Sequence, residues 1–215
     1  MTETATVARV LAALAYGERL ASERAAKVAI LAPDPRGRQH QETVAARESE
    51  NAALLEFRLS EIGSAVMALA FKPFFDAFFA GTEPSDWLEA QAFHYVGDAM
   101  VADFADVLMP AVDPVSAVLL RRALADREDE EAFALDELTR GIEADPSARD
   151  RVAAYSRRVI GEALTQTRKA LNETGALSEL LGGPEVEKRL LLEILERHRR
   201  RLDRLGIEPV EDPLD

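Results

Sequence analysis

The sequence predicts an all-α fold, an antiparallel helical bundle. Apolar residues recur at spacings of three and four along most of the chain, which places them on one stripe of each helix. No stretch shows the alternation that is typical of a strand, and no Asn-Gly pair marks a hairpin turn. Breaks rich in proline, glycine and aspartate divide the chain into six long segments and one shorter crossover.

The composition excludes some classes of binding site and disfavours others. The 215 residues suffice for a sizeable core, and the absence of cysteine excludes disulfides, zinc-thiolate sites and iron–sulfur clusters. A net charge of −13 disfavours a general nucleic-acid surface, because affinity for phosphates comes mostly from cationic contacts. The N-terminal segment lacks a cationic leader, and no apolar run reaches the ~18 residues of a membrane span. We therefore expect a cytoplasmic protein without membrane contact.

The first half of the chain predicts two long helices and a crossover. One helix covers about 3–31 and ends where Pro33 and Pro35 flank Asp34. The second covers about 39–62. The segment 65–80 is rich in phenylalanine and lies between two glycines, so we expect a partly helical crossover that is buried along the bundle.

The second half predicts four more helices. The third long helix covers about 86–109, with Ser85 or Asp86 as its N-cap, and the fourth covers about 114–143, with Asp113 before Pro114. Two additional helices follow at about 148–173 and 184–205. We expect a single domain over residues 1–207 and a loosely held acidic tail over 208–215.

Acidic residues interrupt the apolar stripes of the first four long helices. Glu18 lies in the middle of the first stripe, and the other three helices carry acids or amides in similar places. The candidate site residues are Glu18, Glu48, Asn51, Glu89, Glu128 and Glu131. A buried carboxylate is costly unless it is protonated, paired or bound to a cation. The stripes therefore predict a cluster of acids at one level of the bundle.

The spacing of these acids is typical of a carboxylate-bridged di-metal centre. Such centres take one Glu from each of two helices and a Glu-x-x-His motif from each of the other two, because residues three apart share a helical face. Glu18 and Glu48 each lie 15 residues from Pro33, which places them at the same height in an antiparallel hairpin.

The chain also resembles a known family. The phrases LAYGERLA around Glu18, PSDWLEAQAFHYVGDAMVADF around Glu89, RRVIGEALTQ around Glu162 and the terminal ERHRRRLDRLG are similar to the ferritin-like superfamily, in its MiaE-like branch of tRNA hydroxylases. The resemblance implies a four-helix bundle with a long crossover between its halves and two added C-terminal helices. It also implies a non-haem di-iron centre that activates oxygen, and a tRNA substrate by analogy alone.

Both histidine ligands that the resemblance implies are replaced. Position 51 is asparagine, and the fourth helix reads LADREDEEAF, where the ligand register is either Asp126 with Asp129 or Glu128 with Glu131; the periodicity favours the second. A site of oxygen donors suits Mn²⁺, Mg²⁺ or Ca²⁺ better than an oxygen-activating iron pair. The alternative is a metal-free polar network in which the acids pair with Arg19, Arg47 or Arg122.

Two functions from different classes follow. The first is a ferritin-like bundle protein, expected to form a homodimer, whose degenerate site has no di-iron oxygenase activity. The second is an iron- or manganese-dependent hydroxylase or oxidoreductase. The catalytic residues stay unassigned, and His94 and His198, which lie on apolar faces, are interpreted as core histidines.

Overall fold

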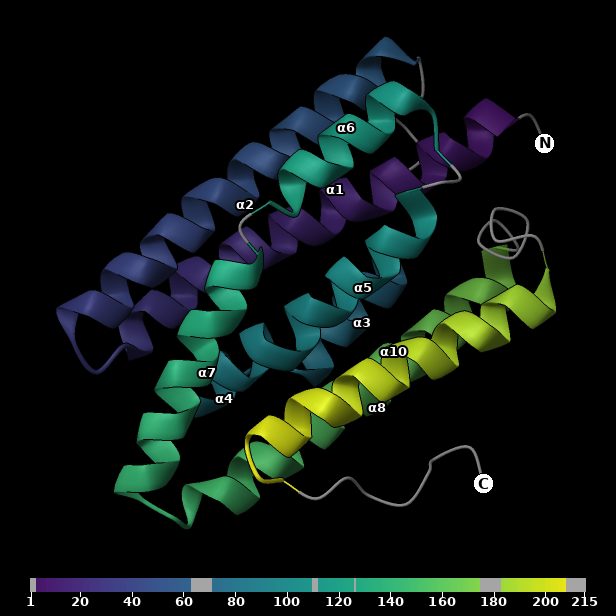
Figure 1. Cartoon of the computed structure of the whole chain (residues 1–215). Helices are drawn as coiled ribbons and strands as arrows, with labels where there is room; N and C mark the ends of the chain where they lie inside the picture. The colour runs from purple at the N-terminus through teal and green to yellow at the C-terminus, as the bar shows by residue number, and fades with distance from the viewer. Residues whose placement is uncertain (1–2, 63–70, 110–111, 126, 175–182, 208–215) are drawn as a thin grey trace.

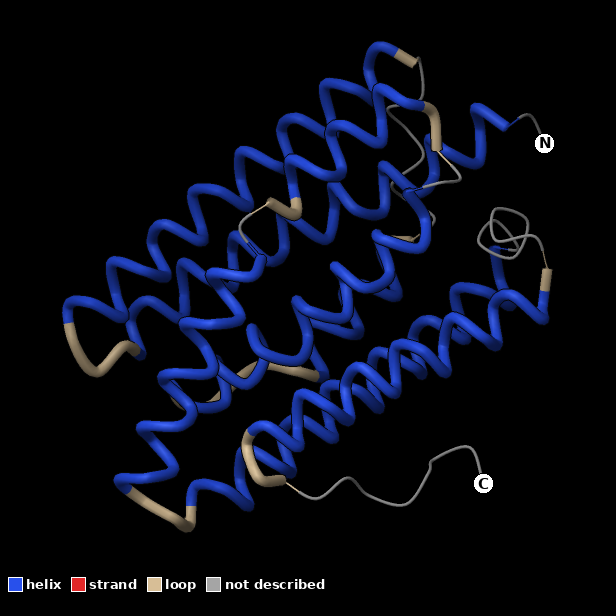
Figure 2. The backbone as a smooth tube through the Cα atoms, viewed as in Figure 1, coloured by secondary structure: helices blue, strands red, loops and turns tan. Residues whose placement is uncertain are grey.

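The computed structural model describes residues 3–62, 71–109, 112–125, 127–174 and 183–207. Every regular element in these ranges is a helix, which confirms the predicted all-α class (Figure 2). No described helix combines the length and the apolarity that a membrane span requires.

The first two helices form an antiparallel pair. Helix α1 (Glu3–Val28) continues into the short η1 (Ala29–Leu31), and α2 (Pro35–Glu61) returns beside it (Figure 1). Helix α2 begins four residues before the predicted start. The side chain of Asp34 accepts a hydrogen bond from the Gly37 amide at 2.7 Å, and Pro35 occupies the first helical position, where no amide proton is needed.

Helix α3 (Lys72–Gly81) forms the described part of the crossover. Phe71 and Phe74 are buried there, as expected for a segment that packs along the bundle. The predicted crossover residues 65–70 lie outside the described residues.

The helix predicted over 86–109 is interrupted by a π-helical turn. It consists of α4 (Trp87–Ala92), η3 (Phe93–Asp98) and α5 (Ala99–Leu108), and Asp86 is the N-cap, accepting a hydrogen bond from the Glu89 amide at 2.8 Å. A π-helical turn contains an extra residue, so side chains before and after it no longer follow one stripe. All six residues of η3 are buried.

The prediction of one helix over 114–143 is wrong, because the chain breaks in the middle. Helix α6 (Pro114–Ala123), capped by Asp113 as expected, lies against α2, and α7 (Arg127–Ala144) leaves it at an angle (Figure 1). The first turn of α7 carries three acids, which a new helix N-terminus stabilises through its dipole. The sequence LADRED over 124–129 contains neither proline nor glycine, so the chain breaks here without the usual helix breakers.

The last two helices confirm their predicted bounds to within one residue at each end. They are α8 (Ala148–Thr174) and α10 (Pro184–Arg204), which overlap in Figure 1 and both contribute side chains to one apolar cluster. Asp103 of α5 joins α10 to the bundle through Arg197 at 2.8 Å and Arg201 at 2.7 Å. The tail over 208–215 lies outside the described residues, and the single domain over 1–207 stays a prediction.

Two apolar clusters flank the centre of the molecule. The first packs α1, α2 and α6 together around Leu11 and Leu55. The second joins η3, α7, α8 and α10 around Tyr95, Leu138 and Tyr155. The polar side chains described below therefore lie on helices that these two clusters hold in place.

Two helical glycines give a matched test of this packing. A Cβ at Gly161 of α8 meets nothing within 4 Å, whereas a Cβ at Gly141 of α7 lies 2.5 Å from Leu88 Cδ2. Gly161→Ala is expected to raise the free energy of unfolding by up to about 1 kcal/mol through helix propensity. Gly141→Ala gains the same propensity but must displace Leu88. Urea unfolding should find G141A less stable than G161A, and equal stabilities would contradict the packing of α4 against α7.

Candidate functional site

Three buried carboxylates and one amide converge where α1, α2 and α7 meet. Glu18 comes from α1, Glu48 and Asn51 from successive turns of α2, and Glu130 from the first turn of α7. Their exposed fractions are 5%, 1%, 5% and 3%. We call Glu18, Glu48 and Glu130 the carboxylate cluster. Buried acids at this density need cations or protons to balance their charge.

The guanidinium of Arg127 lies among these carboxylates. Its Nη1 is 2.9 Å from Glu48 Oε1 and its Nη2 is 3.2 Å from Glu48 Oε2, a two-point contact of the planar fork. Its Nη2 also donates to Glu18 Oε1 at 3.1 Å, and Nη1 donates to Glu130 Oε2 at 3.3 Å. One side chain at the start of α7 therefore binds acids from α1, α2 and α7.

Asn51 supports the same junction. Its Nδ2 donates to the carbonyl oxygen of Ala123 at 3.1 Å and to Glu18 Oε2 at 3.4 Å. The first bond satisfies a carbonyl in the last turn of α6, which has lost its helical partner because the chain breaks after it. The side chain of Asn51 thus replaces the helical hydrogen bond that Ala123 lacks where α6 ends.

The charges of the cluster balance only if one carboxyl holds a proton. Three acids face two cations, Arg127 and Arg47, the latter forming an ion pair with Glu130. Burial raises the pKa of Glu18 well above its usual range, and the hydrogen bond and charge of Glu48 raise it further. Burial lowers the pKa of Arg127, but the charges of Glu48 and Glu18 outweigh it and raise the value overall. The raised pKa makes Glu18 the carboxyl of this cluster that retains a proton to higher pH than an ordinary glutamate.

A second polar group lies next to the cluster in the π-helical turn. His94 Nδ1 lies 2.6 Å from Asp98 Oδ2, and His94 Nε2 lies 3.0 Å from Gln41 Oε1. Burial raises the pKa of Asp98, but the charge and hydrogen bond of His94 and the charge of Arg127 outweigh it and lower the value. The core histidine expected from the sequence is thus fixed between an acid and an amide.

The sequence-predicted site residues divide into two groups. Glu18, Glu48 and Asn51 lie together, whereas Glu89, Glu128 and Glu131 do not point into the cluster. Glu89 accepts hydrogen bonds from the amide and the hydroxyl of Ser85, at 2.7 and 2.8 Å, because it lies in the first turn of α4. Glu128 is exposed, and Glu131 pairs with Arg204 at 3.1 Å.

Neither ligand register predicted for the fourth helix is brought beside Glu18 and Glu48, because α7 starts afresh at Arg127. This start brings Glu130 into the cluster; Asp129 is exposed, and Asp126 lies outside the described residues. Sequence reasoning also missed Arg127 and Asp98. One signal was available, since Glu130 belongs to a stripe of α7 that continues through Ala134, Glu137 and Leu138.

The arginines of the alternative network are placed differently. Arg47 pairs with Glu130 as that alternative expected, but Arg19 pairs with Glu56 and Arg122 is exposed. The cation at the centre is one that the sequence did not single out.

A family model described as "Ferritin-like domain, actinomycetes" matches residues 2–184. The chain belongs to this ferritin-like family. Among solved structures it is similar to "Protein 19 with aldehyde deformylating oxidase activity from Synechococcus", with a TM-score of 0.75 and 17% sequence identity over 98% of this chain and 94% of that one. At this identity the likeness shows the fold. Comparison with curated proteins finds no match.

The donor set of this ferritin-like chain does not fit a di-metal centre in the described arrangement. Each of the three carboxylates contacts the Arg127 guanidinium, and the amide nitrogen of Asn51 donates its protons to oxygen atoms. Among the described residues, no group of three or more His, Cys, Asp or Glu side chains could hold a metal ion. The oxygen atoms that would face a metal face an arginine.

An apolar cavity of about 200 Å³ lies one turn along α1 from Glu18. Helices α1, α3, α5, α8 and α10 contribute to it, and Gly97 of η3, next to Asp98, also lines it. Its apolar wall includes Leu14, Phe74, Phe78, Met100, Leu164 and Ile194. A cavity of this kind suits an apolar ligand rather than a charged one.

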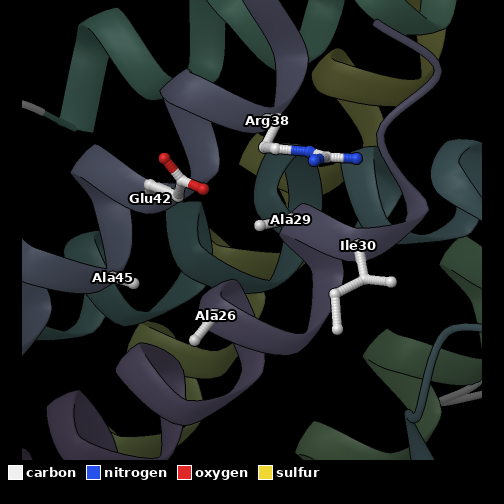
Figure 3. A pocket seen from close by; sticks show the side chains of 6 residues that line it. All are labelled: Ala26, Ala29, Ile30, Arg38, Glu42 and Ala45. Atoms are coloured by element: carbon white, nitrogen blue, oxygen red, sulfur yellow. The ribbon is translucent and has the colours of Figure 1, made fainter. Parts of the chain in front are cut away.

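A second pocket, of about 340 Å³, opens on the surface between the end of α1 and the start of α2 (Figure 3). Three of its lining residues are alanines, and the others are Ile30, Arg38 and Glu42. Both charged side chains are exposed, and none of the cluster residues lines this pocket. It therefore takes no part in the site.

The raised pKa of Glu18 gives a testable pH dependence of stability. Because the pKa of Glu18 is higher in the folded state, the folded chain keeps a proton that the unfolded chain releases above about pH 4.5. Stability from this group is therefore complete below pH 4.5 and is lost as the pH rises toward the folded pKa. Glu18→Gln mimics the protonated acid, so E18Q should gain stability over the wild type increasingly from pH 4.5 to 8.

Urea unfolding at several pH values measures this difference, and Glu48→Gln is the matched control. E48Q removes the carboxylate that Arg127 contacts at two points, so it should lower the free energy of unfolding by about 3 kcal/mol. An unchanged stability difference between E18Q and the wild type across the pH range would show that Glu18 is ionised.

Proposed function

We propose that this chain is a ferritin-like helical-bundle protein with a degenerate carboxylate site, without di-iron oxygenase activity, and that it acts as a non-catalytic interaction module. The observation that carries the proposal is the contact of Arg127 with Glu18, Glu48 and Glu130. Oxygen activation at a carboxylate-bridged centre needs those oxygen atoms as metal ligands. A permanently charged side chain competes for all three of them.

The replaced histidines support the same proposal. Position 51 carries an amide that is committed to a backbone carbonyl, and the residues of α7 that contact Glu18, Glu48 or each other at the cluster, Arg127 and Glu130, include no histidine. The MiaE-like branch, with its tRNA substrate, remains a proposal from resemblance, which the net charge of −13 does not favour. The homodimer and the cytoplasmic location likewise stay predictions.

Elemental analysis of wild-type protein, purified without chelator and again after incubation with Fe²⁺ or Mn²⁺, tests the proposal. We expect much less than one metal ion per chain and an unchanged melting temperature, because a tightly bound ligand must raise the stability of the folded state. Oxygen consumption with Fe²⁺ and a reductant should equal that of buffer. About two iron or manganese ions per chain, lost in Glu48→Ala, would overturn the proposal.

The second candidate is a metal-dependent oxidoreductase. It is favoured by the apolar cavity near the cluster and by the structural likeness to a protein with aldehyde deformylating oxidase activity. Incubation of the chain with Fe²⁺, a reductant, oxygen and a medium-chain aldehyde distinguishes the two candidates. If the wild type releases more of the aldehyde carbon than E48A does, the result favours the enzyme. Equal release by the two proteins favours the interaction module.

A further inference from the structure

We propose that the carboxylate cluster is a cation site whose permanent occupant is the tethered guanidinium of Arg127, and that a free cation can enter only when this side chain is shortened. The inference rests on the proposed function, because it treats the wild-type cluster as metal-free. It goes further by assigning to Arg127 the cross-linking role that a metal ion has in a carboxylate-bridged bundle.

The contacts of Arg127 resemble those of a bound ion more than those of a surface arginine. Its side chain is 11% exposed, and its two terminal nitrogens reach four carboxylate oxygens between 2.9 and 3.3 Å. These oxygens belong to α1, α2 and α7; α1 packs against α2 through an apolar cluster, and α2 is also joined to α7 by ion pairs of Arg36 and Arg47. The guanidinium therefore joins the two halves of the bundle at a buried point, as a bridging cation does.

Removal of the Arg127 guanidinium would leave Glu18 and Glu48 without the positive charge that they contact. Glu130 keeps Arg47 as a partner, whereas the ion pairs that Glu18 and Glu48 form within the described part of the chain are with Arg127. A carboxylate at 1% exposure cannot be ionised cheaply without a counter-charge. The vacated volume would be lined by the four carboxylate oxygens that Arg127 contacts, and such oxygens bind hard divalent cations such as Mn²⁺ and also match a free guanidinium ion.

Arg201 provides a matched control. Its side chain is 12% exposed and contacts Asp103, itself 7% exposed, at 2.7 Å. This pair lies between α5 and α10 and involves one buried acid rather than a cluster of three. Arg201→Ala should therefore destabilise the chain, as Arg127→Ala does, without creating an enclosed group of carboxylates.

The test compares the melting temperatures of R127A, R201A and wild type in buffer, in 1 mM MnCl₂ and in 10 mM guanidinium chloride, with NaCl at equal ionic strength as the reference. We expect at least one of the two cations to raise the melting temperature of R127A by about 5–10 °C when it is in large excess over its dissociation constant. Neither cation should raise that of R201A or wild type by a comparable amount.

If R127A is recovered unfolded, the yield of folded protein after refolding with and without each cation replaces the melting temperature. A cation-dependent gain in R127A alone supports the proposal. No gain with either cation, or an equal gain in R201A, overturns it. This outcome is distinct from failure of the proposed function, which is decided on wild-type protein by its metal content and its oxygen consumption.

Discussion

The ion pairs between Arg127 and the carboxylate cluster are the constraint on which the centre of this bundle depends. Three acids with exposed fractions of 5% or less would repel one another and destabilise the fold if they were left ionised and unpaired. The guanidinium groups of Arg127 and Arg47 pair with these acids, and the raised pKa of Glu18 favours a proton on the third carboxyl. The polar core is therefore compatible with a folded chain because its positive charges come from the chain itself.

The break between α6 and α7 is what allows Arg127 to reach this position. In a continuous helix over 114–143, the apolar stripe of α6 would continue through Glu128 and Glu131, because its periodicity puts these two acids on the same face. The new start at Arg127 shifts the register to Glu130, and Asn51 satisfies the carbonyl of Ala123 that the break exposes. Position 51, where the family resemblance implies a histidine, thus supports the local backbone.

The ferritin-like architecture and the chemistry of its centre are separable properties. The fold keeps acids on α1 and α2 at one level, which is the framework of a carboxylate-bridged site. The cation at the site is decided by the residues at the start of α7, where Arg127 lies. A structural likeness at 17% identity therefore shows the fold, while the function depends on the side chains at the site.

The sequence by itself determined the all-α class, most helix bounds, and the burial of Glu18, Glu48 and Asn51, because helical periodicity and capping residues are local signals. Tertiary structure alone decided the cation of the site. The π-helical turn at Phe93–Asp98 and the break before Arg127 change the register through packing, which no local spacing records. Charge pairing between residues 79 and 109 positions apart along the chain, Glu48 and Glu18 with Arg127, depends on how the helices meet in space.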